Sequence, residues 1–288
     1  MIPPSFGYSA PRTLPEALQL MVQHGDAAKI LAGGHSLLPM MKLRFAEPGH
    51  LIDINRIPEL KGIREENGLI KIGAMTTENE LIDSVLLQQK VPLLPEAARL
   101  IADPQVRNRG TIGGDIAHGD PGNDHPAISI ALDATFILTG PRGQRNVAAA
   151  NFFLGTYMTD MQSDEILTSI HVKPFSTNKT GSAYCKLKRK TGDFATAGAA
   201  VVLEISAGVV SLARIALTNV APTALNAKAA AAALVGKPLT DASIKAAVDA
   251  AMAICDPAED LRGDIEYKTA MAGEMTKRAI RLAASRCK

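Results

Sequence analysis

Two segments in the first half of the chain carry the pattern of an amphipathic helix. Apolar residues stand three and four positions apart over 14–22, where Thr13-Leu14-Pro15-Glu16 has the form of a capping box. Gly25 is placed to end this helix. A second capping box, Thr77-Glu78-Asn79-Glu80, precedes the apolar positions of 81–86. Both segments are therefore predicted to be helices whose first residues are fixed by their caps.

Between and after these helices, apolar and polar positions alternate in the manner of strands. A further helix is predicted from Leu94 to Ala102, because Asp103-Pro104 would stop it there. Together these segments predict a small α/β unit followed by a larger mixed unit. The strands are expected around 30 and 52, and over 69–74, 134–139 and 165–172.

The last third of the chain has a different pattern, with strand-like runs first and alanine-rich helical runs after them. Ser206-Ala207-Gly208 is a natural hairpin turn between the second and third strands. Sheet followed by helices predicts an α+β domain, a three-stranded antiparallel sheet with a three-helix bundle. The strands are expected over 184–190, 198–205 and 209–218, and the helices over about 223–235, 241–254 and 266–285.

A domain boundary is predicted where Pro174 and the polar stretch 176–181 interrupt the apolar pattern. The first domain is expected over 1–177, with subdomains over 1–55 and 56–177. The second domain is expected over 178–288. The predicted fold class of the whole chain is α+β.

The composition is that of an ordinary folded protein, and it narrows the function classes. Of 288 residues, 47% are hydrophobic and 21% are charged, and the net charge of +2 is too small to favour nucleic acid as a partner. No apolar run reaches the roughly 18 residues that span a bilayer, and no secretory signal opens the chain. The expectation is a cytoplasmic protein without direct membrane insertion, which reaches a membrane only through another subunit of a complex.

Cysteine usage limits the redox centres that this chain can hold. Cys185, Cys255 and Cys287 are widely spaced and form no C-x-x-C pair. A disulfide framework is not expected, and three cysteines cannot supply the four thiolates of an iron–sulfur cluster. Any iron–sulfur cluster of a larger complex is therefore expected on another polypeptide.

The candidate chemistry lies in two glycine-rich turns that are far apart in the sequence. We call Ala32-Gly33-Gly34-His35-Ser36 the first glycine turn and Thr111-Ile112-Gly113-Gly114-Asp115 the second glycine turn. Consecutive glycines allow positive φ and bring backbone N–H groups close to a phosphate oxygen, and Ser36 and Thr111 add hydroxyl donors. One glycine pair is typical of an ordinary loop. Two such turns together favour a diphosphate site.

The two commonest nucleotide-binding motifs are nevertheless excluded. Asp53 stands 19 positions after Gly34, where a Rossmann fold places an acidic residue. The glycine spacing is not G-x-G-x-x-G, however, and Pro39 interrupts the segment that should become the phosphate-binding helix. No G-x-x-x-x-G-K-[ST] run occurs, so there is no P-loop either. The predicted site has another architecture.

The motifs resemble the flavoprotein family of p-cresol methylhydroxylase and vanillyl-alcohol oxidase (the PCMH type of FAD-binding fold). Within it, they are most similar to the FAD-binding medium subunits of molybdenum hydroxylases. The resemblance rests on the two turns in their order, on Arg109-Gly110 before the second one, and on the segments 120–124 and 183–189. It covers nearly the whole chain. It implies a two-subdomain FAD-binding domain and FAD as the cofactor of this chain.

The resemblance also implies a set of cofactor-binding residues and no catalytic residue, because flavin enzymes leave the redox chemistry to the cofactor. Asp124 is expected at the ribose or adenine side of FAD, and Lys186 near the O2/N1 edge of the flavin ring. The family usually has Asn where Asp115 stands, which leaves the role of this side chain open. The full set is Ala32, Gly33, Gly34, His35, Ser36, Ile101, Thr111, Ile112, Gly113, Gly114, Asp115, Asp124, Leu167, Lys186 and Asp193.

These positions also have plain structural interpretations. Asp124 fits an ordinary turn, and Lys186 fits a solvated lysine on an edge strand. His118 and His125 lack the spacing of metal ligands and are expected in a solvated loop, so no metal site is predicted. Similar alternatives are a surface side chain for His35, a loop carboxylate for Asp193 and core packing for Ile101 and Leu167.

The activity implied by the resemblance is electron transfer within an oxidoreductase complex. Electrons would pass from a molybdenum cofactor on a large subunit, through [2Fe-2S] clusters on a small subunit, to FAD and an external acceptor. The assembly implied is a dimer of heterotrimers. In its length and its segment Asp120-Pro121-Gly122-Asn123-Asp124-His125, the chain most resembles the medium subunit of carbon monoxide dehydrogenase, which implies carbon monoxide as the substrate of the complex. The alternatives are a xanthine, aldehyde or N-heterocycle dehydrogenase, a stand-alone flavin oxidoreductase, and a non-catalytic nucleotide-binding scaffold.

Overall fold

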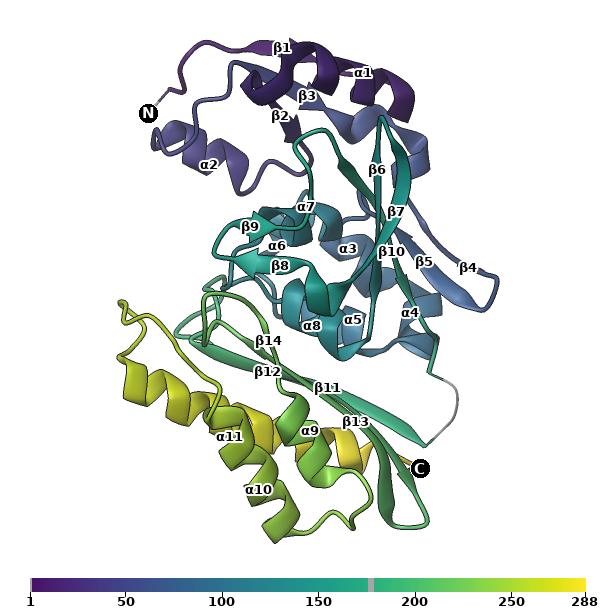
Figure 1. Cartoon of the computed structure of the whole chain (residues 1–288), viewed down its shortest axis with the longest axis vertical. Coiled ribbons are helices and arrows are strands. Elements are labelled where there is room, and N and C mark those ends of the chain that lie inside the picture. The colour runs from purple at the N-terminus through teal and green to yellow at the C-terminus, as the bar shows by residue number, and fades with distance from the viewer. Residues whose placement is uncertain (1, 176–178) are drawn as a thin grey trace.

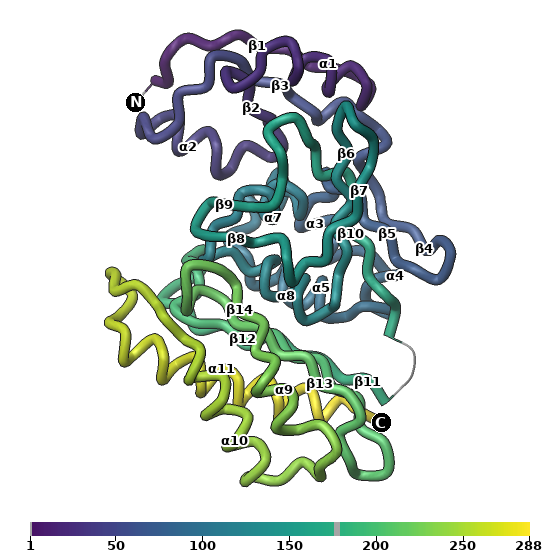
Figure 2. The backbone as a smooth tube through the Cα atoms, in the orientation of Figure 1, coloured from purple at the N-terminus to yellow at the C-terminus, as the bar shows by residue number. Residues whose placement is uncertain are grey.

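The computed structural model describes residues 2–175 and 179–288, and it stacks three units along the long axis of the molecule (Figure 1). A small N-terminal unit lies at one end, a larger middle unit follows, and a C-terminal unit lies at the other end. The boundary predicted between 177 and 178 lies outside the described residues. In Figure 2 residues 32–36, which connect the strand β2 (Ala28–Leu31) to the helix α2 (Leu37–Lys42) in the N-terminal unit, lie beside the middle unit.

The N-terminal unit is a parallel three-stranded sheet with a helix packed on it. Its strand order is β1-β3-β2, with β1 at Gly7–Ser9, β2 at Ala28–Leu31 and β3 at His50–Asp53. Helix α1 (Leu14–His24) begins where predicted, because the Thr13 side chain accepts a hydrogen bond from the N–H of Glu16. A short helix, α2 (Leu37–Lys42), follows the first glycine turn.

The middle unit is built on a five-stranded antiparallel sheet with the order β4-β5-β10-β6-β7. Helices cover one face and share with it a core that includes Ile70, Phe136 and Ile170. The strands are β4 (Ile63–Glu66), β5 (Leu69–Gly73), β6 (Thr135–Gly140), β7 (Gly143–Ala148) and β10 (Ile166–Val172), with the small hairpin β8 (Phe153–Gly155) and β9 (Met158–Thr159). The helices are α3 (Glu78–Asp83), α4 (Val85–Lys90), α5 (Leu93–Ala98), α6 (Pro104–Arg107), α7 (Ile112–His118) and α8 (His125–Ala131).

The helix predicted from Leu94 to Ala102 is shorter than expected. Helix α5 ends at Ala98, and Ala102 has a positive φ of 44°. Asp103 does not stop a helix but starts one, because its carboxylate accepts from the N–H groups of Gln105 and Val106 at the beginning of α6. The described residues also include the single 3₁₀ turns η1 (Gly25–Ala27), η2 (Ile54–Arg56), η3 (Pro58–Leu60) and η4 (Ala149–Asn151).

The C-terminal unit has a four-stranded antiparallel sheet rather than the three strands predicted. The extra strand is β14 (Leu225–Asn226), which is too short to produce an alternating pattern. The predicted hairpin turn is confirmed, because Ala207 and Gly208 have φ values of 50° and 78° between β12 and β13. The other elements are β11 (Thr180–Leu187), β12 (Ala197–Ser206), β13 (Val209–Thr218), α9 (Lys228–Leu234), α10 (Asp241–Met252) and α11 (Ile265–Ser285).

The C-terminal sheet is covered on both faces, which ties the last two units together. Val201 and Leu203 pack with the helices α9, α10 and α11, whereas Tyr184 and Val202 belong to the core of the middle unit. This alternation along β12 explains why residues 197–203 of the strand are all buried. As a result, residues of β11 reach the helices of the middle unit.

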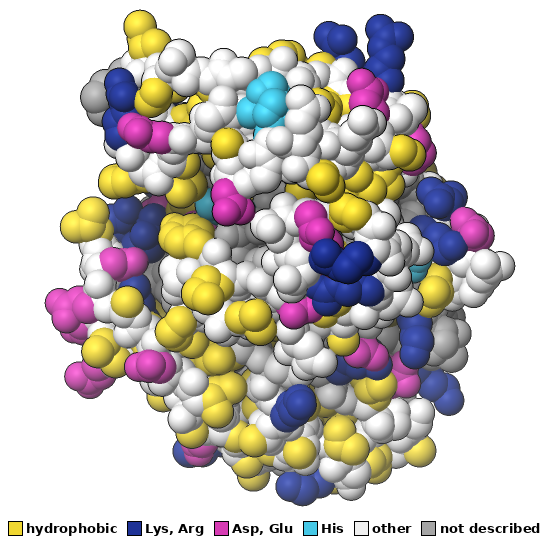
Figure 3. All heavy atoms as spheres, turned by 45° about the horizontal axis from the view of Figure 1, so that its top comes forward, with side chains coloured by type: hydrophobic (Ala, Val, Ile, Leu, Met, Phe, Trp, Pro, Cys, Tyr) yellow, Lys and Arg dark blue, Asp and Glu magenta, His cyan; other side chains and the backbone are white. Residues whose placement is uncertain are grey.

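The surface carries a mixture of charges. On the face drawn in Figure 3, basic and acidic side chains are interspersed, without a broad field of one sign. Over residues 2–175 and 179–288, no helix combines the length and the apolar character that crossing a membrane requires.

Candidate cofactor site

The first glycine turn leaves the end of β2 and enters α2. Gly34 has a positive φ of 78°, which only glycine adopts without strain. The turn is held from one side by Asn55, whose side-chain amide donates to the carbonyl oxygen of Ala32 at 2.8 Å and to Asp53 at 2.7 Å. His35 and Ser36 are exposed, and the His35 ring lies 3.1 Å from the carbonyl oxygen of Gly33.

The backbone donors of the first glycine turn are unused. Among residues 2–175 and 179–288, no backbone hydrogen bond takes the N–H groups of Gly33, Gly34, His35 or Ser36. Four consecutive N–H groups without a protein acceptor, at a turn with a left-handed residue, form the kind of concavity that binds anions. The first glycine turn is therefore chemically suited to a phosphate group.

The second glycine turn is a different structure, because the chain itself uses its donors. The N–H of Ile112 donates to Thr76 at 3.0 Å, and the N–H of Gly113 donates to Ala74 at 2.9 Å. The N–H of Gly114 donates to the Thr111 hydroxyl at 3.2 Å, which caps α7. This turn is fastened to the segment 74–78 and has no free backbone donor at these positions.

The glycines of the two turns serve close packing more than unusual backbone angles. A Cβ atom on Gly33 would lie 2.3 Å from the carbonyl oxygen of Arg109, and one on Gly113 would lie 2.4 Å from the Cβ of Ala74. The expectation that consecutive glycines adopt positive φ holds only for Gly34. Gly33 thus packs against Arg109 and Gly110, which directly precede the second turn, and a Cβ atom on Gly114 would lie 3.5 Å from the Cβ of Ala32, so the two turns lie against each other.

A buried ion pair lies behind the second glycine turn. Nε2 of His125 lies 2.9 Å from Oε2 of Glu78, and both side chains are almost fully buried. Burial by itself would lower the pKa of His125, but the charge and hydrogen bond of Glu78 outweigh it and raise the pKa to about 9. His125 is therefore not in a solvated loop, and neither is His118, which is the half-buried last residue of α7, so the expectation was wrong for both.

Asp115 lies next to this pair and lacks a partner. Its residue surface is half-buried, yet its Oδ2 atom is buried and accepts no hydrogen bond within the described chain. Burial raises the pKa of this carboxyl to about 8. Nδ1 of His125 is likewise buried without a partner. The Asn123 side chain fixes this region by donating to the carbonyl oxygen of Asp115 at 2.9 Å.

Asp124 and Lys186 form a second buried ion pair, although they lie 62 positions apart along the chain. Nζ of Lys186 lies 2.6 Å from Oδ2 of Asp124, and their side chains are 2% and 4% exposed. The Tyr184 hydroxyl donates to the other carboxylate oxygen of Asp124 and lies 3.1 Å from the Thr218 hydroxyl. Lys186 is therefore not a solvated edge-strand lysine, and Asp124 is not an ordinary turn residue.

The remaining predicted residues have various surroundings. Asp193 is held by Arg189 and Arg262 at 2.8 Å each, which lowers its pKa to about 2. Its loop passes close to the end of α5, where the Cβ position of Gly192 lies 4.0 Å from Ala102. Ile101 is half-buried in that segment. Ile112 and Leu167 belong to the buried core of the middle unit.

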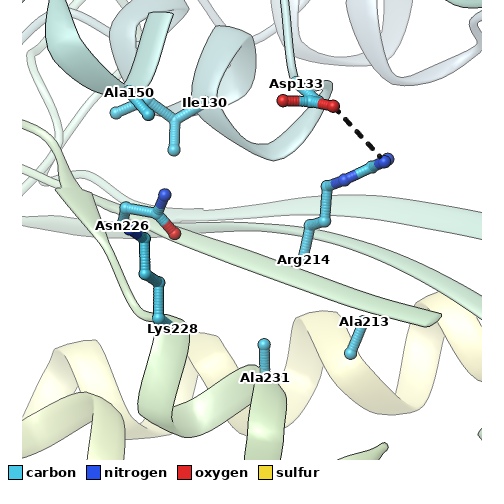
Figure 4. A pocket seen from close by; sticks show the side chains of 8 residues that line it. All are labelled: Ile130, Asp133, Ala150, Ala213, Arg214, Asn226, Lys228 and Ala231. Carbon is cyan, nitrogen blue, oxygen red and sulfur yellow. Dashed lines mark ion pairs between the residues drawn. The ribbon is translucent and has the colours of Figure 1, made fainter.

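The structure thus brings most of the predicted residues into one continuous region. The two glycine turns touch, Asn123 connects the second turn to Asp124, and Asp124 pairs with Lys186 on β11. Leu167 is the member most firmly explained by core packing. The cavity in Figure 4, of about 310 Å³, lies elsewhere, because its lining includes Asp133, Arg214 and Lys228 but none of the predicted cofactor residues.

Two family models together match almost the whole chain. The model of the FAD binding domain in molybdopterin dehydrogenase matches residues 4–174. The chain belongs to this family. The model of the CO dehydrogenase flavoprotein C-terminal domain matches residues 182–283. As a member of the molybdopterin dehydrogenase FAD-binding family, the chain is an FAD-dependent oxidoreductase subunit, as the motifs predicted.

Individual relatives match over their full length. The carbon monoxide dehydrogenase medium chain of Hydrogenophaga pseudoflava is 64% identical over 287 residues, and the match covers 100% of both chains. The solved carbon monoxide dehydrogenase of the same organism, which lacks the Mo-pyranopterin moiety of its molybdenum cofactor, matches with a TM-score of 0.99 and 66% identity over 100% of both chains. The glyceraldehyde dehydrogenase medium chain of Sulfolobus acidocaldarius is 35% identical and covers 98% of this chain and 99% of its own.

The residues present fit the FAD that this family binds. The first glycine turn offers unused N–H donors for a diphosphate, and buried polar atoms of Asp115 and His125 lack partners beside it. The roles of the individual residues of the FAD site stay predictions.

Sequence reasoning missed several residues that shape this site. Glu78 was seen only as part of a capping box, and its side chain in fact turns inward to His125. Asn55 and Tyr184 were not singled out at all. Their partners lie 23 and 60 positions away in the sequence, so no local pattern signals the contacts. Only Tyr184 carried a signal in the sequence, because a tyrosine among the apolar residues of a strand usually needs a hydrogen-bond partner for its hydroxyl.

Proposed function

We propose that this chain is the FAD-carrying medium subunit of a carbon monoxide dehydrogenase complex. The observation that supports this most is the match to the H. pseudoflava medium chain, which extends over all of both chains at 64% identity. Identity this high over the full length favours retention of the partners and of the complex. FAD, when bound, supplies the capacity to accept electrons and to pass them to an external acceptor.

In this proposal the other redox centres lie on partner chains. The three cysteines are too few for a four-thiolate cluster, and a molybdenum-binding large subunit and an iron–sulfur small subunit would supply the preceding centres. The assembly proposed is a dimer of heterotrimers. A cytoplasmic location, with membrane contact only through the complex, stays a prediction from the sequence.

The contacts described above suggest a role in FAD binding for each part of the site. The first glycine turn would bind the FAD diphosphate through its free N–H groups, and the second would hold the first in place through the contact at Gly33. The pair of Asp124 and Lys186 would flank the cofactor further along the same region. The FAD-binding part is proposed over 1–177 and the C-terminal part over 178–288.

A second candidate substrate class is an aldehyde. The glyceraldehyde dehydrogenase medium chain matches nearly the whole chain at 35% identity, so this architecture serves more than one oxidation. The substrate is expected to bind on another chain of the complex, and the choice between the two candidates therefore needs the assembled enzyme.

The test is to express this chain alone and together with large and small subunits from the same source. Alone, it should bind one FAD that acid releases completely, and it should oxidise neither carbon monoxide nor aldehydes with a dye as acceptor. The complex should contain molybdenum and iron and should oxidise carbon monoxide. Oxidation of aldehydes but not carbon monoxide by the complex would favour the second candidate. Turnover by the single chain would contradict both.

A further inference from the structure

Asp115 presents an electrostatic conflict in the FAD site proposed above. It ends the second glycine turn, which touches the turn proposed to bind a diphosphate. A carboxylate at this place would repel the negatively charged phosphates, and its buried oxygen would lack a donor. Some feature of the protein must remove this penalty if the site binds FAD.

The charges around Asp115 offer it no cation of its own. Together with Asp115, the residues Glu78, Asp124, His125 and Lys186 form what we call the buried charge cluster. His125 gives its Nε2–H to Glu78 at 2.9 Å, and Lys186 gives its ammonium group to Asp124 at 2.6 Å. Each cation is therefore committed to another carboxylate. Counted in this way, the buried charge cluster holds three carboxyl groups but only two cations.

The charged groups that interact most strongly with Asp115 come from several neighbouring elements. His125 and Asp124 stand at the start of α8, Glu78 at the start of α3, and Asp120 in the loop between α7 and α8. Tyr184, from β11, interacts with it electrostatically as well. Three of these five groups are carboxyl groups, and only His125 favours a negative charge on Asp115.

We propose that Asp115 is held as a neutral carboxylic acid and enters the FAD site as a hydrogen-bond donor instead of an anion. Protonation balances the buried charge cluster at zero, with two carboxylates and two cations. It also converts the side chain from an acceptor into a group with one O–H donor, which suits an environment rich in acceptor oxygens. This inference rests on the proposed FAD site.

The consequence is that FAD binding depends on pH through Asp115. The pKa of about 8 that burial gives Asp115 agrees with a neutral form at pH 7. Because ionisation adds a negative charge beside the diphosphate, FAD affinity falls as the pH rises through this value. If only the neutral form binds, the affinity falls about tenfold between pH 7 and pH 9. The FAD diphosphate keeps its charge over this range.

The first measurement concerns the FAD-free full-length chain and is independent of cofactor binding. Difference infrared spectra between pH 7 and pH 10 should contain the carbonyl stretch of a protonated carboxyl at the lower pH. Asp115→Asn should remove this band. Asp120→Asn is the matched control, because the Asp120 carboxylate already accepts from the Gly122 N–H and the Tyr157 hydroxyl. A band absent from the wild type, or retained in Asp115→Asn, would overturn the proposal.

The second measurement is the FAD dissociation constant at pH 7 and pH 9 by flavin fluorescence. The wild type should lose about tenfold in affinity, whereas Asp115→Asn, which is neutral and keeps an N–H donor, should change less than about threefold. His125 remains in both proteins, and because the Asp115 charge helps to raise the pKa of His125, the His125 titration contributes at least as much pH dependence to Asp115→Asn as to the wild type. A larger fall in the wild type is therefore due to Asp115. Equal pH dependence in the two proteins would overturn the proposal. Failure of both to bind FAD at any pH would instead contradict the proposed FAD site.

Discussion

The two glycine turns look alike in sequence but differ in what their backbone donors do. In the second turn, the N–H groups of Ile112, Gly113 and Gly114 are all taken by the protein, whereas those of Gly33 to Ser36 in the first turn have no acceptor among the described residues. A glycine pair alone therefore does not identify a phosphate site. The unused donors distinguish the turn that we propose binds the diphosphate from the turn that we propose supports it, and substitutions in each turn should separate binding from stability.

The largest effect is expected behind the second turn, at Glu78. Glu78→Ala leaves His125 buried without its counter-charge, which should lower the free energy of unfolding by about 3–5 kcal/mol below pH 6.5. The folded pKa of His125, about 9, lies above its usual value of 6.5. The stabilisation by the pair is therefore complete below pH 6.5 and is lost as the pH rises through 9. Urea unfolding at several pH values should show that the difference in the free energy of unfolding between wild type and variant shrinks between pH 6.5 and pH 9. A difference that stays constant over this range would contradict the stabilisation assigned to the pair.

The supporting role of the second turn predicts a stability defect at Gly113. A Cβ there would lie 2.4–2.6 Å from Ala74 atoms, including the backbone carbonyl oxygen, so the overpacking in Gly113→Ala should cost about 1–3 kcal/mol. The molecules that remain folded should still bind FAD. Urea unfolding and FAD titration of the same preparation measure both effects, and unchanged stability would remove the distinction between the turns.

The proposed binding role of the first turn predicts that a substitution at Gly34 weakens FAD binding while the chain still folds. Gly34→Val forces a β-branched residue to a φ of 78°, which costs about 1–2 kcal/mol and displaces the N–H groups that follow. FAD affinity should fall roughly 100-fold, or about 2.7 kcal/mol of binding free energy, while the chain stays folded. Gly143→Val is a matched control, with a φ of 106° in an open hairpin distant from both glycine turns in the sequence. Wild-type affinity in folded Gly34→Val would contradict the assignment.

The smallest effect is expected at Asn55, which holds the first turn from outside. Asn55→Ala removes the hydrogen bond to the carbonyl oxygen of Ala32, and such a bond contributes about 1 kcal/mol. FAD affinity should fall by about fivefold because the turn is less well ordered before binding. Asn55→Asp keeps the shape but replaces the donor with a carboxylate beside Asp53, so it should weaken FAD binding at least as much as Asn55→Ala. An unchanged dissociation constant for both variants would show that the turn needs no support from this side.

Local signals in the sequence predicted the elements better than the site. The caps at Thr13 and Thr77 and the hairpin at Ala207-Gly208 act through neighbouring residues. The capping box at Thr77 and the hairpin formed as expected. At Thr13 only the side-chain cap formed, because the Glu16 carboxylate accepts from the N–H of Arg12 instead of completing the box. Pro39 was interpreted as a helix breaker, but it stands in the first turn of α2, where a missing N–H costs little. The strand β14 consists of two residues, which no periodicity can reveal.

The parts of the site that could not be predicted depend on contacts between distant segments. Glu78 and His125 are 47 positions apart, and nothing near either residue signals a buried pair. The two turns contain the same glycine pair, yet only the tertiary contacts of Gly113 with Ala74 and of Gly33 with Arg109 reveal that these glycines serve packing. The sequence therefore predicted segments that the fold brings together, but it did not distinguish the two turns by the use of their backbone donors.

Amide hydrogen exchange with and without FAD tests the difference between the turns most directly. In the FAD-free chain, the amides of Ile112 to Asp115 should already be protected, because each donates to a protein acceptor, whereas those of Gly33 to Ser36 should exchange rapidly. Saturating FAD should slow exchange strongly in the first turn and change the second turn little. If FAD left the first turn rapidly exchanging, or protected only the second, the assignment of the first turn as the diphosphate site would be wrong.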